Sequence, residues 1–421
     1  MSDSIPAKPV GCDEHDPSLL SVEQAQARAL DLVTPVHESQ TLALHDALGH
    51  ILAEDIVSPI NVPGYANSAM DGYAVLATDL PLQQTTRLTV IGTAYAGVPF
   101  NDHVKPGECV RIMTGAKLPD GADTVIMQEH VQREDETISI GPGHSAGQNV
   151  RHPGEDIAAG NAVLTRGQRV GPAELGLLAS LGIAQVRVWR RLRVAFFSTG
   201  DELRPVGTPL DDGQIYDSNR YTLHGMLTQL GVEIIDLGVI RDDPTAVEAA
   251  FHDAAQQADA IITSGGVSVG EADFVKATLD KLGQVDFWRI AMKPGKPLAL
   301  GKVDQALFFG LPGNPVSVMA TFYLFVVPAL QAMMGQTRTA PLTVTAISKH
   351  KLKKRPGRMD FQRGVLSNEN GRLMVDAAGM QASHILSGMS RANCFIVLAQ
   401  ASGDVEAGSE VPVMPFHGLM P

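Results

Sequence analysis

Apolar and polar blocks alternate between residues 190 and 335 in the manner of successive strands and helices. Continuous apolar runs such as LRVAFFST (192–199) are typical of strands that are buried on both faces. We expect strands at 192–199, 232–238, 259–266 and 305–313, and helices at 219–231, 244–257, 272–283 and 314–335. Strands that alternate with helices of this length predict a doubly wound parallel sheet with right-handed crossovers.

The pattern changes on either side of this region. Short β-rich runs separated by Gly, Pro and Asp fill residues 80–140 and return after residue 341, where NENG (368–371) predicts a hairpin turn. We expect strands at 87–92, 109–115, 124–131, 137–143, 342–350, 359–366, 372–379 and 393–400, and a loop at 67–75. Apolar residues at helical spacing behind Ser21, a natural cap, predict a helix over 21–33.

Together these patterns predict an α/β multidomain fold. The expected parts are an extended mixed N-terminal lobe (17–58 and 150–189), an inserted small β domain (59–149), a doubly wound α/β domain (190–337) and a C-terminal β domain (338–421). The longest apolar stretch, 322–334, is short and contains Pro328, so it predicts a buried helix and not a membrane span.

Composition and charge narrow the classes of function. A net charge of −13 disfavours nucleic-acid binding across the whole surface, because that mode depends on neutralising phosphates. The three cysteines form no CxxC pair and the thirteen histidines show no HExxH spacing, which disfavours a disulfide framework and a zinc site. The N-terminus has no basic segment followed by an apolar core. We therefore expect a cytoplasmic protein that binds neither nucleic acid nor membrane.

Four loops rich in glycine or acidic residues follow the predicted strands. They are STGDEL (198–203), IRDDP (240–244), TSGGVSVGEADF (263–274) and FGLPGNP (309–315). The carboxyl ends of parallel strands lie at one edge of the sheet, where such sheets bind ligands. Gly265, Gly266 and Gly270 permit positive φ and let backbone N–H groups approach a phosphate. Asn314 and Pro315 suit a helix N-cap and first turn. The alternative interpretation is ordinary punctuation between strands and helices.

Acidic residues crowd the same predicted edge. The loops carry Asp201, Glu202, Asp242, Asp243, Glu271 and Asp273. Like charges that lie close together raise each other's pKa unless a cation intervenes, and oxygen ligands suit Mg²⁺ held against phosphates. Several of these acids also suit helix capping, an alternative that applies least to Asp273.

A pair of lysines predicts an anion site. Lys293 and Lys296 lie in the turn MKPGKP (292–297), which its prolines stiffen, and two ammonium groups held together are costly without an anion. A solvated surface turn is the alternative. The segment 349–363 carries seven Lys/Arg against one Asp, which predicts either a solvated edge or, through Arg358 and Arg363, oxyanion binding.

An ordered set of motifs covers nearly the whole chain after residue 17. It consists of NSAMDGYA, RIMTGA, GEDI, STGDEL, DSNRY, TSGGVSVGEADF, MKPGKP and GLPGNPVS. In this order the motifs resemble the molybdopterin molybdenumtransferase family, the MoeA type that includes the E domain of gephyrin. The resemblance implies an enzyme with adenylylated molybdopterin and molybdate as substrates, which hydrolyses the adenylate in a Mg²⁺-dependent step and inserts molybdenum. It also implies a homodimer whose cleft lies between the molybdopterin-binding domain of one subunit and the N-terminal lobe of its partner.

The resemblance carries roles to particular residues of this sequence. It implies a catalytic set of Asp71, Thr114, Asp156, Glu202, Ser268 and Asp273, and a metal site of Asp242, Asp273 and Glu202. With the glycine chemistry it implies a cofactor-binding set of Gly265, Gly266, Ser268, Gly313, Asn314, Lys293, Lys296, Pro297, Arg363 and Ser387. Asp243 stays an alternative to Asp242, and Ser390 to Ser387. The expected protein partners are the molybdopterin adenylyltransferase and acceptor molybdoenzymes or their chaperones.

Three other functions fit parts of the sequence. A nucleotide pyrophosphate hydrolase of the competence-damage-inducible type shares the alternating domain but lacks the two β domains and the GEDI lobe. The enzyme that adenylylates molybdopterin usually reads GGTG where this chain reads GGVSVGEAD. A non-catalytic scaffold could dispense with Asp273 and the lysine pair, and this chain keeps them.

Overall fold

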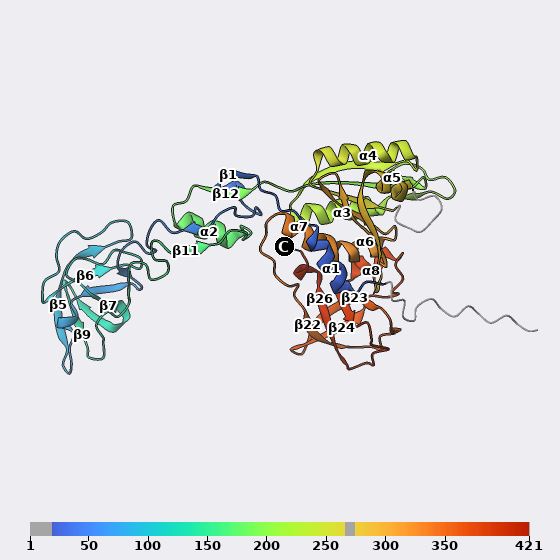
Figure 1. Cartoon of the computed structure of the whole chain (residues 1–421). Helices are drawn as coiled ribbons and strands as arrows, with labels where there is room; N and C mark the ends of the chain where they lie inside the picture. Colours follow the sequence, from blue (N-terminus) through green and yellow to red (C-terminus); the bar gives the residue numbers. More distant parts are fainter. Residues whose placement is uncertain (1–18, 266–273, 421) are drawn as a thin grey trace, which may run out of the picture. The chain divides into compact units, whose positions relative to one another are not determined.

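A computed structural model describes residues 19–265 and 274–420 of the chain. These residues belong to two units (Figure 1). Of the described residues, unit 1 takes in 19–40, 49–51, 188–265 and 274–420, and unit 2 takes in 41–48 and 52–187. The predicted division into four parts stays a prediction, and each unit is described below on its own.

Unit 1 contains the predicted α/β sheet. Its order is β16 (Glu233–Ile240), β13 (Arg193–Thr199), β17 (Ala260–Ser264), β21 (Ala306–Leu311), β20 (Pro297–Val303) and β18 (Gly283–Arg289). The first four strands are parallel, as predicted, and β20 and β18 add an antiparallel edge. The turn MKPGKP therefore connects β18 to β20, whose last and first residues, Arg289 and Pro297, lie opposite each other.

Helices cover both faces of this sheet (Figure 1). They are α1 (Val22–Asp31), α3 (Ser218–Leu230), α4 (Pro244–Gln257), α5 (Phe274–Leu282), α6 (Pro315–Thr321) and α7 (Val327–Met333). Successive residues of β13 point to opposite faces: Phe196 packs in the core with α1, α3, α6 and α7, and Phe197 packs with α4 and α5. Both faces are buried, which explains the continuous apolar run in the sequence.

The helix predicted over 314–335 is not continuous. A π-helical segment, η4 (Phe322–Val326), separates α6 from α7. Pro328 has no N–H and cannot donate to the carbonyl of Leu324 four residues earlier. The side-chain amide of Gln26 donates to that carbonyl instead, at 2.9 Å. The span Pro315–Met333 is long and apolar enough to cross a membrane, but 78% of it is buried in the structure, as expected of a core helix.

Helix α1 packs in unit 1, although the sequence analysis expects 17–58 in the N-terminal lobe. Ser21 caps the helix in a capping box with Gln24, as the sequence predicts. Its apolar face, Val22, Ala25 and Ala29, is buried in the same core as α7. A face of this kind has to be covered, and unit 1 provides the cover.

The C-terminal part of unit 1 is a curled β sheet. Its order is β19 (Met292–Lys293), β23 (Met359–Glu369), β24 (Arg372–Ala377), β22 (Val344–Ser348), β26 (Glu410–Pro415) and β25 (Cys394–Leu398), and a β23–β25 pairing closes the ring. The predicted turn NENG is confirmed, with Asn370 and Gly371 at positive φ between β23 and β24. Strand β19 places Lys293 beside Asp360 of β23, so the MKPGKP turn joins this sheet.

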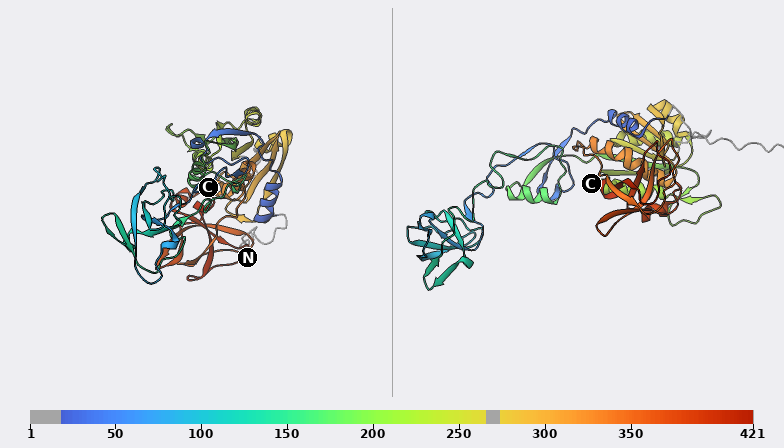
Figure 2. Two further views of the ribbon diagram at one scale, coloured as in Figure 1. Left: turned by 90° about the vertical axis from the view of Figure 1, so that its left-hand side faces the viewer. Right: turned by 90° about the horizontal axis from the view of Figure 1, so that it is seen from below.

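Unit 2 contains a six-stranded sheet. Its order is β7 (Thr124–Met127), β4 (Gly72–Val75), β6 (Glu108–Ile112), β5 (Thr86–Ala94), β9 (Thr137–Ile140) and β8 (Val131–Glu134), drawn from blue to teal in Figure 2. The loop predicted at 67–75 is wrong, because it contains β3 (Asn67–Ser68) and β4. Tyr73 and Ala74 are buried on opposite faces of the sheet. A Cβ at Gly72 would lie 2.1 Å from the carbonyl oxygen of Ile126, so the neighbouring strand requires glycine there.

Short elements complete the two units. They are β1 (Ser39–Ala43), β2 (Ile56–Val57), β10 (Val150–Arg151), β11 (Ala162–Leu164), α2 (Pro172–Ser180), β12 (Gln185–Trp189), β14 (Leu203–Arg204), β15 (Ile215–Tyr216) and α8 (Leu386–Arg391), with 3₁₀ turns at Leu44–Asp46, Ala77–Asp79, Gln128–His130 and Phe416–Gly418. The pairs β1–β12, β3–β10, β2–β11 and β14–β15 each form a two-stranded sheet.

Candidate functional site

The predicted loops meet at the carboxyl edge of the parallel strands. The N–H of Asp201, after β13, donates to Asp242 Oδ2 at 3.3 Å, and the N–H of Asp242, after β16, donates to Asp201 Oδ1 at 3.4 Å. On the other side of the edge, the N–H of Gly265, after β17, donates to the carbonyl of Leu311 at 3.2 Å. The loops after β13 and β16 therefore meet at this edge, and Gly265, the described start of the loop after β17, contacts β21, whereas residues 266–273 of that loop lie outside the described residues.

Asn219 ties two of these loops together, a role that the sequence analysis does not assign. Its side-chain amide donates to Ser264 Oγ at 2.9 Å and to the carbonyl of Gly313 at 2.7 Å. The preceding Asp217 caps α3 by accepting from the N–H of Arg220 at 3.0 Å. The sequence motif that points to this role is DSN (217–219) at the start of a predicted helix. One polar residue is enough for the N-cap, so the other two are available for other contacts.

Acidic residues of the loops after β13 and β16 repel one another, and a bound cation would relieve this repulsion. Burial raises the pKa of Asp242, and the charges of Asp201 and Glu202 raise it further, while the N–H of Asp201 opposes the shift. Asp243 instead caps α4, because its Oδ1 accepts from the N–H of Ala246 at 2.9 Å. Of the two adjacent acids, Asp242 therefore faces the other carboxylates.

Oxygen donors of this kind fit Mg²⁺, and a bound cation would relieve the like-charge repulsion on Asp242. Over residues 19–265 and 274–420, no three His, Cys, Asp or Glu side chains lie close enough together to form a metal site. Of the three predicted metal ligands, the structure describes Asp242 and Glu202, and Asp273 lies outside the described residues. Gly266 and Ser268, predicted for the binding and catalytic sets, also lie outside them.

Glycine is required at the mouth of β17. Gly265 has a φ of 92°, and a Cβ there would lie 2.9 Å from the carbonyl oxygen of Thr199. At the next loop, Asn314 occupies the N-cap position of α6 and Pro315 its first turn, as predicted, but the Asn314 side chain makes no capping hydrogen bond. That side chain instead lines a cavity.

This cavity, called here the lysine cavity, has a volume of about 450 Å³. It brings together five residues of the predicted binding set, namely Lys293, Lys296, Pro297, Gly313 and Asn314. Arg358 also lines it, so three cationic side chains surround the space. The cavity is suited to a small anion, and Gly313 and Asn219 connect its wall to the loop after β17.

Arg363, a predicted ligand of the oxyanion, is buried and does not line the lysine cavity. Arg363 is 1% exposed, and its guanidinium donates to the carbonyls of Met380 and Ala382. Burial lowers the pKa of Arg363, and Asp360 opposes that shift. Ala382 lines the cavity, whereas Arg363 does not. In this structure Arg363 therefore holds a wall segment, and the direct anion contact stays a prediction.

The predicted serines lie on α8. Ser387 and Ser390 are both exposed, and neither lines the lysine cavity. Gly388 between them faces Arg363, because a Cβ on Gly388 would lie 3.1 Å from Arg363 Nε. The choice between the two serines stays open.

Unit 2 brings together two of its three predicted residues. The N–H and the hydroxyl of Thr114 both donate to Asp71 Oδ1 at 2.7 Å, and they hold the pKa of Asp71 below its usual value. Asp156 is exposed, and its N–H donates to the carbonyl of Val62. Asp71 thus follows β3 as an oriented, ionised carboxylate, and Asp156 lies on a separate turn.

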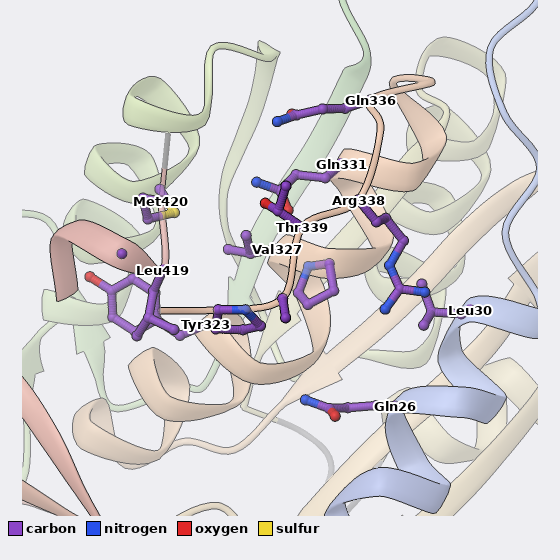
Figure 3. Close-up of a pocket in the computed structure, with 14 residues that line it drawn as sticks. Gln26, Leu30, Tyr323, Val327, Gln331, Gln336, Arg338, Thr339, Leu419 and Met420 are labelled. Carbon is purple, nitrogen blue, oxygen red and sulfur yellow. The ribbon is translucent and has the colours of Figure 1, made fainter. Parts of the chain in front are cut away.

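A further cavity of about 440 Å³ lies between α1, α7 and the C-terminal residues Leu419 and Met420 (Figure 3). Its walls are mainly amide and apolar side chains, including Gln26, Tyr323 and Gln331. Among the residues that the structure describes around it, Arg338 is the one charged group. That lining offers neither a cation site nor a cluster of anion donors, so this cavity does not suit the predicted chemistry.

Known proteins match most of the length of the chain. Three family descriptions fit consecutive parts of the chain: the MoeA N-terminal region (domain I and II) at residues 20–182, the probable molybdopterin binding domain at 195–332, and the MoeA C-terminal region (domain IV) at 345–416. The molybdopterin molybdenumtransferase of Haemophilus influenzae is 50% identical over 405 residues, which are 96% of this chain and 100% of that protein. This chain belongs to the molybdopterin molybdenumtransferase family.

Other members of the molybdopterin molybdenumtransferase family agree in sequence and fold. The gephyrin of Dictyostelium discoideum is 35% identical over 434 residues, which cover 89% of this chain and 59% of that protein. The crystal structure of the molybdopterin biosynthesis MoeA protein from Pyrococcus horikoshii is 30% identical, with a TM-score of 0.82 over 94% of this chain and 100% of that one. The resemblance and fold class expected from the motifs are confirmed.

Proposed function

We propose that this chain inserts molybdenum from molybdate into adenylylated molybdopterin in a Mg²⁺-dependent step that releases AMP. Membership of the molybdenumtransferase family supports the transfer of molybdenum. The observation that carries the finer proposal is the single sheet edge that holds crowded acids on one side and the lysine cavity on the other. A dianion accompanied by a divalent cation is complementary to such an edge.

Each group of side chains has a defined task in this proposal. Asp242 and Glu202, with Asp273, would hold Mg²⁺, whose charge when bound assists the departure of AMP. Lys293 and Lys296 donate charge-assisted hydrogen bonds to the molybdate oxygens. Asn219 keeps the loops after β17 and β21 in register, so that phosphate and molybdate bind side by side. The sulfur ligands of molybdenum come from the substrate, which agrees with the burial of Cys109 and Cys394.

The proposed assembly is a homodimer with two-fold symmetry. In it, Asp71, Thr114 and Asp156 of one subunit serve the sheet edge of the partner. The oriented carboxylate of Asp71 supports a role beyond local structure, because Thr114 spends both of its donors on it. Sedimentation at micromolar concentration should give a dimer, and a fully active monomer would refute this arrangement.

AMP release is the direct test of the proposed reaction. The purified chain is incubated with adenylylated molybdopterin, molybdate and Mg²⁺, and both AMP and active cofactor are measured. Asp242→Asn should require about tenfold or more Mg²⁺, because it removes a ligand. Asp243→Asn is the matched control, since it makes the same charge change and asparagine still caps α4. Equal Mg²⁺ requirements in the two variants would remove Asp242 from the metal site. Absence of AMP from the parent would refute the function.

A further inference from the structure

A second cationic cavity adjoins the lysine cavity. It has a volume of about 380 Å³ and is called here the basic cavity. Its cationic lining consists of Lys293, Lys353, Lys354, Arg355 and Arg358. Lys293 and Arg358 also line the lysine cavity, so the two spaces share part of a wall. Neither the proposed transfer step nor the motif resemblance gives a role to Lys353, Lys354 or Arg355.

The carboxylates of the basic cavity do not neutralise it. Asp360 and Asp404 are the two acids in its lining, against the five cations. Asp360 is 5% exposed, lies 3.8 Å from Lys293 Nζ and accepts from the side-chain amide of Gln362 at 3.0 Å. Asp404 accepts from the N–H of Lys354 at 2.9 Å and lies 3.5 Å from Lys351 outside the cavity. The lining therefore keeps an excess of positive charge in a chain whose net charge is −13.

One of these cations is fixed inside the wall. Lys354 is 6% exposed, and its Nζ donates to the carbonyls of Ser402 at 2.8 Å, Arg355 at 3.1 Å and Gln400 at 3.3 Å. Burial lowers the pKa of Lys354, Asp360 opposes the shift, and Lys293 adds to it. Three carbonyls satisfy the donors of this ammonium without cancelling its charge. The wall thus places a positive charge beside the cavity, and holding that charge there costs energy unless an anion occupies the cavity.

Two more cations are free to contact a ligand. Lys353 and Arg355 are exposed, and among the residues that the structure describes no carboxylate lies within 4 Å of either ammonium or guanidinium group, although Lys353 interacts electrostatically with Asp404 at longer range. Protection of a sheet edge does not account for them, because the β23–β25 pairing closes the ring of strands β22–β26. The charges lie instead on the loop that runs from β22 to β23, beside the shared wall of the two cavities.

We propose that the basic cavity is a second anion site, which binds a phosphate-type tetrahedral oxyanion next to the anion of the lysine cavity. Lys353 and Arg355 donate the contacts, and Lys354 supplies the fixed positive charge. Two sources have the same chemistry: a phosphate group carried by the substrate, or a free oxyanion. The first source rests on the proposed function, whereas the site itself does not.

Calorimetric titration of the full chain with inorganic phosphate tests the site. Lys353→Ser/Arg355→Ser changes only exposed side chains, and it should weaken phosphate binding about tenfold or more, because two charge-assisted contacts are lost. Lys105→Ser/Arg372→Ser is the matched control: it also removes one exposed lysine and one exposed arginine, which lie outside the two cavities. Lys296→Ala, which alters the lysine cavity alone, should leave this phosphate site intact.

Two results would overturn the proposal. One is equal phosphate affinity in Lys353→Ser/Arg355→Ser and in the control pair. The other is a parent that binds no phosphate at low ionic strength, where charged contacts are strongest. Neither result depends on the transfer reaction, so the site and the proposed function can fail separately.

Kinetics then identify the source of the oxyanion. If the substrate carries it, the KM for adenylylated molybdopterin should rise about tenfold or more in Lys353→Ser/Arg355→Ser, with the molybdate requirement unchanged. If the oxyanion is free, that KM stays at the parental value, and inhibition by added phosphate weakens in the variant.

Discussion

The bridge formed by Asn219 should measurably stabilise unit 1. Its side-chain amide nitrogen donates two hydrogen bonds, one to Ser264 Oγ at 2.9 Å and one to the carbonyl of Gly313 at 2.7 Å. Asn219→Ala removes both hydrogen bonds at once. Asn219→Asp keeps the size of the side chain but replaces the donating nitrogen with a carboxylate oxygen. That oxygen would face the carbonyl oxygen of Gly313, which repels it.

The structure sets the magnitude. A side-chain hydrogen bond contributes about 0.5–1.5 kcal/mol net, so the loss of two corresponds to about 1–3 kcal/mol in the free energy of unfolding. Asn219 Oδ1 is buried without a partner among the described residues, and alanine removes that unfavourable group as well. We therefore expect about 1–2 kcal/mol for Asn219→Ala, in the lower part of that range, and a larger loss for Asn219→Asp.

Tryptophan fluorescence isolates the relevant unit. The chain has two tryptophans, Trp189 and Trp288, and both belong to unit 1. Urea unfolding followed by this signal reports unit 1 even if unit 2 unfolds separately. Asn314→Ala is the control, because its side chain lies in the neighbouring loop and makes no capping hydrogen bond, and it should change stability by less than about 0.5 kcal/mol. If both Asn219 variants unfold at the parental midpoint, the bridge does not hold the loops.

Two further predictions concern charged groups of unit 1. The pKa of Asp242 is raised in the folded state, so stability falls as the pH rises from the pKa of an unfolded aspartate through the higher pKa of the folded one. Asp242→Asn should therefore raise the unfolding midpoint at pH 7 but not at about pH 3. Equal gains at both pH values would show that the raised pKa is not the cause. Arg190 binds both oxygens of Asp259, at 2.7 and 2.8 Å, and the two side chains are 18% and 21% exposed. Asp259→Asn should cost unit 1 about 3 kcal/mol by the same fluorescence assay, and a loss below about 1 kcal/mol would show that the pair is not needed.

The parts of the fold that the sequence predicts best are those with strong local patterns. The runs that became β13 and β17 have apolar centres and are followed by glycine and acidic residues, so both their burial and the position of their loops could be expected. Strand β4 has only four residues, and Gly72 in it is required by the backbone of β7, a partner about fifty residues away in the chain. No local pattern reports such a contact.

Strand β18 shows a different limit. The residues of β18 are mostly half-buried or exposed, as on an antiparallel edge, and a strand with few buried positions carries little hydrophobic signal. Pro328 signals an irregularity before α7, where the structure has a π-helical segment. The Leu324 carbonyl, which Pro328 cannot bond, accepts instead from Gln26, almost three hundred residues earlier in the chain. The missing N–H of Pro328 predicts that one carbonyl loses its usual donor, but tertiary packing determines which residue replaces that donor.

At the candidate site, residue type could be predicted and orientation could not. Asp242 and Asp243 are chemically identical and adjacent, and only the start of α4 decides that Asp243 caps the helix while Asp242 turns to Asp201. Arg363 has the chemistry of an oxyanion ligand, but its guanidinium is directed to the carbonyls of Met380 and Ala382. The direction of a side chain depends on neighbours that are remote in sequence, so a motif fixes what a residue can do and not which group it meets.

The charge of the chain illustrates the same distinction on a larger scale. A net charge of −13 disfavours binding modes that use the whole surface, yet the basic cavity has five cations and two acids in its lining. Both statements hold because salt screens charges on a solvated surface over roughly 8–10 Å. A small anion at Lys353 and Arg355 responds to the few groups within that distance and hardly at all to the distant acids. Composition therefore limits the partners that need a broad surface, and the local arrangement of lysine, arginine and acid side chains determines which small ligands are bound.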